Sequence, residues 1–470
     1  MIRQIIYKEI LENLLSLRFI LSLLLAVLLF AAAGFVFTAK YRQESQDYWK
    51  DTNENLSSLS EQTKRLCDVA LYEQTVYRKP KPLALCTDGF EKYFPNYVRF
   101  NIFSMYIPGV KSRGNFDLGR FSDMDLVFII SLILSFIALI FTYDTICGEK
   151  EAGTLRLMLA TSIHRHKILI GKYVGVMFTL GIPVLLGLLV TLLIVISSRD
   201  VVISAGDWLK ILTIVLLSFL YLSIFVLLGL FVSSRTAHSA NSMVILLLAW
   251  VGLVILIPSF GRIISDAAFE SPTQAELQRK LTEVGKKIED DRASGKFGKN
   301  ADSFGFKVKN PPGTAQMMNA QTEARNQVRE FHLNKMIAPL IFGRSFTRLS
   351  PTVIYQCASE AIAGIGITRF KSLYQQVKRY QADLKEYVRG KDAEDPESLH
   401  LLCAHNQAIK DWGVISKRSV SFDTIPKFQE RDLALGQSLK LAIWDIGLLV
   451  LFNLVFFAAS YVSFLKYDVR

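Results

Sequence analysis

Long uninterrupted apolar runs dominate this sequence. Six runs approach or reach the length of about 20 residues that a helix needs to cross a bilayer. They cover residues 18–40, 126–143, 173–196, 211–232, 243–260 and 441–464. Because hydrocarbon offers the backbone no hydrogen-bond partner, each run must be helical. Buried helices of a soluble protein are a weaker explanation, since a soluble core rarely supplies six uncharged runs of this length.

The first run is preceded by an amphipathic stretch. Its apolar residues fall mostly on one helical face and its charged residues lie off that face. The apolar residues are Ile2, Ile5, Ile6, Ile10, Leu14 and Leu15, and the charged ones are Lys8, Glu9 and Glu12. The stretch either lies along the membrane surface or extends the first span toward the cytoplasm. The apolar run is too long for a cleaved signal peptide, and no A-x-A-like site follows it.

The apolar runs divide the chain into five parts. These are 1–39 (amphipathic helix and span 1), 40–125 (polar), 126–261 (spans 2 to 5), 262–440 (polar) and 441–470 (span 6 and the C-terminal tail). Within the second polar part, charged periodic stretches predict helices near 274–292, 314–336 and 360–389. The predicted fold is an all-α polytopic membrane protein with six transmembrane helices. It has a mainly helical extracytoplasmic domain between spans 5 and 6.

Positive charge in the short loops predicts the orientation. With both termini inside, eleven basic residues lie in short inner segments, whereas the short outer loop at 197–210 has two, balanced by two acids. We therefore expect a bacterial plasma (inner) membrane protein with cytoplasmic termini and both long polar segments outside. Segment 262–440 has 28 Lys and Arg against 21 Asp and Glu, within a formal net charge of +12. Its surface either binds an acidic partner or is an ordinary solvated surface of mixed charge.

The five cysteines divide by compartment under this orientation. Two lie in each outer segment and Cys147 lies inside. An even number in an oxidising compartment is typical of disulfides. We therefore predict the pairs Cys67–Cys86 and Cys357–Cys403.

The sequence contains few candidates for chemistry. It has no G-x-x-x-x-G-K-[ST] loop for phosphates, no H-E-x-x-H and no C-x-x-C. His164 and His166 flank Arg165 in a basic loop, where solvated side chains are a better interpretation than a metal site. Asp445 in span 6 is either a functional intramembrane acid or an interfacial residue near a helix N-terminus. Asn453, deeper in the same span, is interpreted as a structural contact to a neighbouring helix. We expect no catalytic or metal site and no nucleic-acid partner.

The cytoplasmic loop 144–172 is the most informative segment. Gly153 and Thr154 open a short amphipathic helix, and Leu155, Leu157, Met158 and Leu159 make it apolar enough to dock on a soluble partner. The basic residues Arg165, His166, Lys167 and Lys172 are expected to meet lipid headgroups. A helix held between two spans can pass a rigid-body push to both. The alternative is a plain connector that carries positive-inside charge.

Three stretches resemble the type-2 exporter permeases of ABC transporters. The first is 149–155 (EKEAGTL) followed by 168–172 (ILIGK), which is similar to the cytoplasmic loop that forms the coupling helix in that family. The second, 227–235 with 240–242, resembles the tight turn between spans 4 and 5. The third is the Ser-Pro element at 349–351. The chain departs from the family in the coupling loop. Family members often have a Pro before a basic pair there, whereas this chain has 160–164 (ATSIH).

The resemblance implies a non-catalytic subunit whose coupling helix contacts a separate ATPase. It implies Glu149, Glu151, Gly153, Thr154, Leu155 and Leu159 as the ATPase-coupling residues. It further implies two ATPase copies, which bind ATP and Mg, and a second permease copy or a related permease. Membrane lipid surrounds the spans, and an extracytoplasmic protein is a candidate partner.

The resulting hypothesis is a permease that couples ATP hydrolysis to export. One alternative keeps the fold and makes the chain a mechanotransmitter that acts on an outer partner without transport. A membrane receptor or anchor is disfavoured because no cytoplasmic signalling domain is visible. An intramembrane enzyme is disfavoured for want of paired catalytic residues.

Overall fold

The computed structural model describes residues 2–89, 91, 94–107, 124–160, 164–269, 272–301, 309–404 and 413–466. Within these ranges, six helical stretches are long and apolar enough to cross a membrane. They are Leu17–Gln62, Leu126–Glu151, Arg165–Ser197, Ala205–Arg235, Ser239–Ser265 and Leu435–Leu465, called spans 1 to 6 below. The prediction of an all-α polytopic membrane protein with six spans is confirmed.

Four spans are single helices and two contain a π-helical turn. The single helices are α2 (Leu17–Gln62), α9 (Arg165–Ser197), α10 (Ala205–Arg235) and α17 (Leu435–Leu465). Span 2 consists of α5 (Leu126–Phe128), η3 (Ile129–Leu134), α6 (Ser135–Thr142) and α7 (Cys147–Glu151), and span 5 of α11 (Ser239–Trp250), η4 (Val251–Leu256) and α12 (Ile257–Ala268). Both η3 and η4 are π-helical, a geometry that is often found at functional sites. Next to these turns, the indole of Trp250 donates to the hydroxyl of Ser135 at 2.9 Å and joins spans 5 and 2.

The amphipathic N-terminal stretch forms a separate helix, α1 (Ile2–Leu14), rather than an extension of span 1. The backbone breaks at Ser16, whose hydroxyl accepts from the amide of Phe19 and caps α2. Helix α1 packs against α9, which in turn packs against α2. Glu9, which the sequence pattern places off the apolar face, is buried at 6% exposure. That part of the prediction is wrong, because Glu9 faces a lysine of α9.

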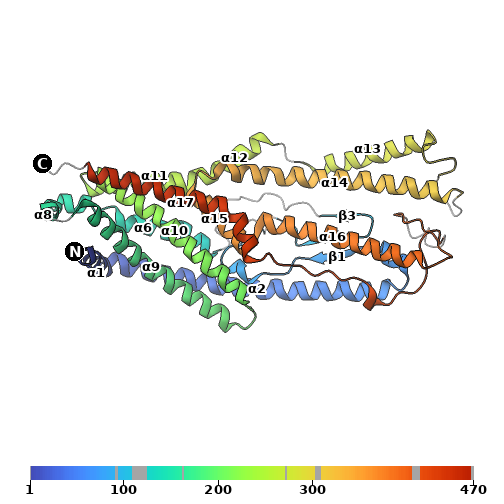
Figure 1. The fold of residues 1–470 in the computed structure, drawn as a ribbon, viewed down its shortest axis with the longest axis horizontal. Helices are drawn as coiled ribbons and strands as arrows, with labels where there is room; N and C mark the ends of the chain where they lie inside the picture. Colours follow the sequence, from blue (N-terminus) through green and yellow to red (C-terminus); the bar gives the residue numbers. More distant parts are fainter. Residues whose placement is uncertain are drawn as a thin grey trace.

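Helix α2 continues far beyond span 1. Its 46 residues extend for about 70 Å, more than twice the hydrocarbon thickness of about 30 Å. The other elements away from α1 form what we call the outer part, by its position in the molecule alone. They are α3 (Leu66–Leu71), β1 (Gln74–Tyr77), η1 (Pro82–Leu85), β2 (Tyr97–Phe100), β3 (Met105–Tyr106), α13 (Gln274–Ala293), α14 (Pro311–Thr347), α16 (Gly366–Ala393) and η6 (Phe422–Thr424). Both termini lie at one end of the molecule, and α13, α14, α16 and the far end of α2 form the other (Figure 1).

A small antiparallel sheet stabilises this outer part. Its strand order is β1-β2-β3, and the register pairs Gln74 with Phe100. Phe100 and Val98 of β2 pack on the buried face of α16, which contributes Val377 and Leu384. The sequence analysis did not predict these strands, because runs of two to four residues are too short for alternation to be recognised.

One helix of the second polar segment packs among the spans. Helix α15 (Pro351–Ala363) lies between α10 and α17, and 12 of its 13 residues are buried. Ser350 caps α15 and donates to the carbonyl of Leu253 within the π-helical turn η4. Tyr221 of span 4 contacts the hydroxyl of Thr352 at 3.0 Å. Segment 262–440 therefore does not form a domain that is wholly separate from the spans, because α15 is apolar enough to be buried among them.

The structure contradicts both predicted disulfides, since none of the five cysteines is bonded to another. Cys67 lies in the core beneath the small sheet, whereas Cys86 packs in the large core formed by the spans. Cys357 lies on α15, and Cys403 packs with Ala315 and Val414 in a third cluster. Two cysteines of one polar segment are therefore placed in different parts of the protein.

Candidate functional site

The predicted coupling loop folds into two short helices, α7 and α8 (Thr154–Ala160), joined by a tight turn. Gly153 makes this turn with a φ of +72°, a left-handed conformation that favours glycine. The Thr154 hydroxyl bonds back to α7, donating to the carbonyl of Glu149 at 3.4 Å. The loop therefore has a defined shape rather than that of an extended connector.

Helix α7 is fixed between the end of span 4 and the start of span 5. Lys150 donates to the carbonyls of Ser234 and, at 3.0 Å, Thr236, at the C-terminal end of α10. Glu151 accepts from the amide of Ser239 at 2.9 Å and from its hydroxyl at 2.7 Å, at the N-terminal end of α11. Each charge thus faces the helix end of opposite partial charge. Movement of α7 would be transmitted to both spans.

A second attachment joins α7 to the N-terminal helix. Lys172 of α9 lies 2.7 Å from a carboxylate oxygen of Glu9 in α1 and 2.9 Å from one of Glu149 in α7. The Lys172 side chain is only 1% exposed. The expectation that Lys172 meets lipid headgroups is therefore wrong, because two carboxylates hold it inside the protein. The apolar run alone places Lys172 just before span 3, whereas α9 begins at Arg165 and puts this lysine inside the helix, where a charge requires a partner.

The leucines of α8 face two different directions. Leu155 is fully buried at 0% exposure and belongs to the main core, with Met158 and Leu159 packed against it. Leu157 is 73% exposed. Of the predicted coupling residues, Glu149, Leu155 and Leu159 therefore contact the chain's own interior. Glu151, Gly153 and Thr154 remain exposed. Leu157, one of the four apolar residues expected to make the helix dock, is exposed as well, although it is not among the coupling residues that the resemblance implied.

The two polar residues predicted in span 6 make different contacts. Asp445 is 3% exposed and forms an ion pair with Arg348, at the end of α14, with 2.8 Å between Oδ1 and Nε. The amide of Asn453 donates to the carbonyl of Leu220 in α10 at 2.9 Å, a helix-to-helix contact of the kind the structural interpretation expected. Neither residue lies near the α7–α8 segment, so the structure does not bring the two sets of predicted residues together.

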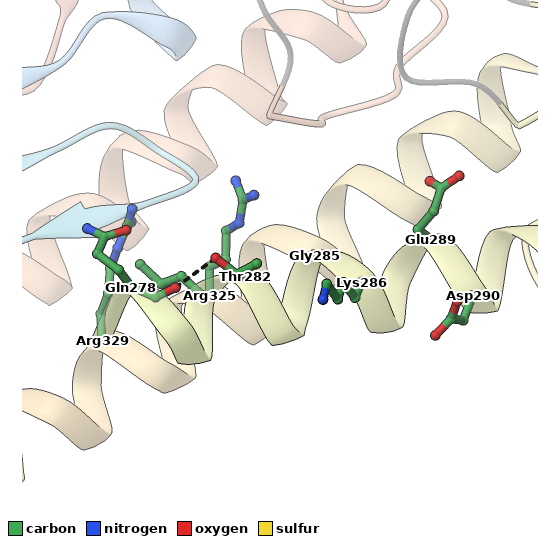
Figure 2. Close-up of a pocket in the computed structure, with 9 residues that line it drawn as sticks. Gln278, Thr282, Gly285, Lys286, Glu289, Asp290, Arg325 and Arg329 are labelled. Atoms are coloured by element: carbon green, nitrogen blue, oxygen red, sulfur yellow. Dashed lines mark hydrogen bonds between the residues drawn. The ribbon is translucent and has the colours of Figure 1, made fainter. Parts of the chain in front are cut away.

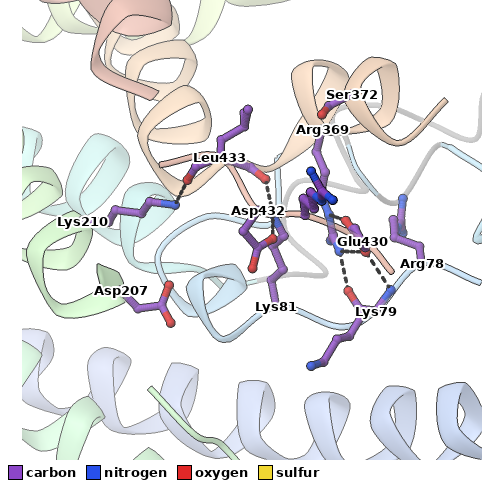
Figure 3. A network of polar contacts seen from close by, with 12 residues as sticks. Arg78, Lys79, Lys81, Asp207, Lys210, Arg369, Ser372, Glu430, Asp432 and Leu433 are labelled. Carbon is purple, nitrogen blue, oxygen red and sulfur yellow. Dashed lines mark hydrogen bonds and ion pairs between the residues drawn. The ribbon is translucent and has the colours of Figure 1, made fainter. Parts of the chain in front are cut away.

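A polar cluster joins the outer part to the spans (Figure 3). We call it the outer junction and define it as Lys81, Lys210, Arg369, Glu430 and Asp432. Arg369 of α16 pairs with Glu430 at 2.9 Å, and Lys81 pairs with Asp432 at 2.9 Å. Lys210, at the outer end of α10, donates to the carbonyl of Leu433 just before α17 begins. The sequence analysis missed these contacts, which connect residues up to several hundred positions apart.

Comparison with known proteins agrees with this architecture. A probable ABC transporter permease protein NosY of Stutzerimonas stutzeri is 44% identical over 57 residues, and its counterpart in Pseudomonas aeruginosa is 39% identical over 57 residues. Each match covers 12% of this chain and 21% of the relative, so the chain spans about one fifth of these relatives' length. The family described as ABC-2 family transporter protein matches residues 3–469. With six spans and a match over nearly its whole length, this chain belongs to the ABC-2 family and is a permease subunit of an ABC transporter.

Proposed function

We propose that this chain is the permease of an ATP-driven exporter and that a separate ATPase subunit docks on the exposed side of α8. The observation that carries the proposal is the arrangement of the α7–α8 segment. Its inner face is fixed to spans 3, 4 and 5 through Lys172, Lys150 and Glu151. Its outer face presents Leu157 to solvent. A push on α8 would therefore reach three spans at once.

Other parts of the proposal follow from the ABC-2 family. The ATPase, expected in two copies, binds ATP and Mg, and this chain is non-catalytic. A second copy of the chain or a related permease completes the complex. We place the complex in a bacterial inner membrane, with both termini and α8 on the cytoplasmic side, because the short loops at that end carry the basic residues.

Mechanotransmission is the second candidate function, and the outer junction favours it. Helix α2 continues without a break from span 1 into the outer part, and the outer junction fixes α16 to the ends of spans 4 and 6. Such connections would convert a movement of the spans into a movement of the outer domain. The chain would then act on an outer partner without moving a substrate across the membrane.

Reconstitution tests the two functions against each other. The chain would be purified from its native cell with its bound ATPase, and the pair would be placed in proteoliposomes. Export predicts ATP-dependent movement of a compound across the vesicle membrane. Mechanotransmission predicts ATPase stimulation by an outer protein with no such movement. Purification without any ATP-binding protein would contradict both.

A further inference from the structure

Two arginines in the outer part of α14 form no ion pair with any residue that the structure describes. Arg325 and Arg329 are four residues apart and therefore share one helix face. Among the described residues, neither forms an ion pair. Burial, together with the charge of Arg325, lowers the pKa of Arg329. The negative charge of Glu73 opposes this effect, but Glu73 does not form an ion pair with Arg329. A partly buried cation without a counter-charge costs free energy that a bound anion would recover.

These arginines line a groove between α13 and α14 (Figure 2). The groove has a volume of about 780 Å³ and is open along one side. On α13, the lining residues extend from Gln278 to Asp290, a distance of about 18 Å along a helix. This length matches five or six residues of extended chain. Lys286 adds a third cation to the lining, whereas Glu289 and Asp290 make the far end of the groove acidic. The part that favours an anion is therefore the part beside Arg325 and Arg329. An enclosed pocket is typical of a small-molecule site, whereas an open groove of this length fits a peptide segment.

A smaller pocket adjoins the groove at Arg329, which lines both. The pocket has a volume of about 110 Å³ and is bounded by β3, α14 and α16. His332, which is 8% exposed, lines it, and the Nε2 atom of His332 has no hydrogen-bond partner among the described residues. In its Nε2–H tautomer this imidazole can donate to a carboxylate. The pocket is large enough for one carboxylate group and presents both a cation and a donor to it, while the carboxylate of Glu330 in its lining is already paired with Lys378 at 3.1 Å.

With the membrane boundary taken at Ser265, the last residue of span 5, the groove lies beyond the lipid headgroups. At the outer end of span 5, the hydroxyl of Ser265 donates to the carbonyl of Pro339 in α14 at 2.6 Å. Arg329 is ten residues earlier in α14, or about 15 Å further from the membrane. A headgroup layer is roughly 5–8 Å thick. A partner in the aqueous compartment can therefore reach the arginines, whereas a bilayer lipid of the same membrane cannot.

We propose that the groove binds an extended acidic segment of a partner protein on the side of the membrane opposite the termini. One carboxylate of the segment enters the pocket and accepts hydrogen bonds from Arg329 and His332. A second carboxylate pairs with Arg325. Binding at this groove does not rest on export, because the site lies on the outer part and requires no movement of the spans.

Fluorescence anisotropy with labelled hexaglutamate tests the proposal on the full-length chain in zwitterionic nanodiscs. Wild type should bind hexaglutamate, and Arg325→Gln/Arg329→Gln should weaken the binding by about tenfold or more, because two charge-assisted contacts are lost. The matched control Arg379→Gln/Arg389→Gln removes the same charge from exposed positions of α16 and should bind as wild type. Hexaglutamine should not bind.

Several results would overturn the proposal. One is that wild type does not bind hexaglutamate, and another is that Arg325→Gln/Arg329→Gln binds it as tightly as wild type does. A third is that the control Arg379→Gln/Arg389→Gln loses as much affinity as the groove variant, and a fourth is that hexaglutamine binds as tightly as hexaglutamate. A further one is recruitment to phosphatidylglycerol vesicles that depends on Arg325 and Arg329 while hexaglutamate does not bind. That outcome would assign the arginines to a lipid headgroup instead.

Discussion

The ammonium group of Lys172 lies 2.7 Å from the carboxylate of Glu9, although the two residues are 163 positions apart. This contact joins the N-terminal helix α1 to span 3, and the second contact of Lys172, with Glu149, extends the connection to α7. All three side chains are largely shielded from solvent. The charges therefore depend on one another, since a buried charge that loses its partner is strongly destabilising.

Replacing Lys172 with Met should destabilise the end of the protein that contains α1, α7 and α8. The substitution leaves the carboxylates of Glu9 and Glu149 buried without a cation, at a cost of about 3–5 kcal/mol. We expect a lower melting temperature of the purified protein in detergent and weaker coupling of ATP hydrolysis to function. Lys167→Met, at an exposed position one turn earlier, is the control and should melt as wild type. Equal melting of the two variants would contradict the structural role of Lys172.

The two leucines of α8 should respond differently to substitution. Leu157→Asp changes an exposed side chain, so the protein should retain its abundance and melting temperature but lose association with the ATPase. Leu155→Ala leaves a cavity in the core and should cost about 2–5 kcal/mol of stability. Co-purification and thermal unfolding measure the two effects. Wild-type association of the Leu157→Asp variant would remove α8 as the docking surface.

A glycine in span 3 permits close contact with span 1. A Cβ atom at Gly187 would overlap the ring of Phe30, which is fully buried. Gly187→Ala should therefore destabilise the protein by about 1–3 kcal/mol through overpacking. Gly447→Ala in span 6 is the matched control, because no atom of the described residues, apart from its chain neighbours and the nearby backbone of its own helix, lies within 4 Å of its Cβ position. Thermal unfolding in detergent should separate the two variants, and identical melting curves would contradict this packing.

The buried cysteines should be thiols of low reactivity. Burial raises the pKa of Cys86 to about 12, and those of Cys357 and Cys403 to about 11. Because the thiolate is the reactive species, alkylation near neutral pH should be slow in the native protein and complete after denaturation. Mass spectrometry of non-reduced peptides should find every cysteine alkylated. A peptide pair linked through Cys67 and Cys86 would instead restore the disulfide prediction.

The orientation can be tested by labelling from one side of the membrane. Lys286→Cys, on the exposed surface of α13, should react with a membrane-impermeant maleimide in intact spheroplasts. Ala237→Cys, in the turn between spans 4 and 5, should react only after the membrane is permeabilised. The buried native cysteines should contribute little background. The reverse labelling pattern would place α8 outside and rule out its contact with a cytoplasmic ATPase.

Sequence by itself determined the six spans and the long outer helices. Crossing a membrane depends on a local property, an apolar run of sufficient length whose backbone must bond within itself. The outer helices α13, α14 and α16 likewise follow from charged periodic stretches near 274–292, 314–336 and 360–389. The family resemblance of 149–155 is also local, because it depends on residue types at fixed spacing.

Only the tertiary structure decided how these elements face one another. In α8, four of seven residues are large and apolar, so periodicity could not tell that Leu155 is buried and Leu157 exposed. The burial of Glu9 depends on Lys172, which is remote in sequence. The two predicted cysteine pairs are wrong, because two cysteines in the same segment of the sequence need not lie close together in space. Pairings of this kind depend on distance in space, which a one-dimensional pattern does not contain.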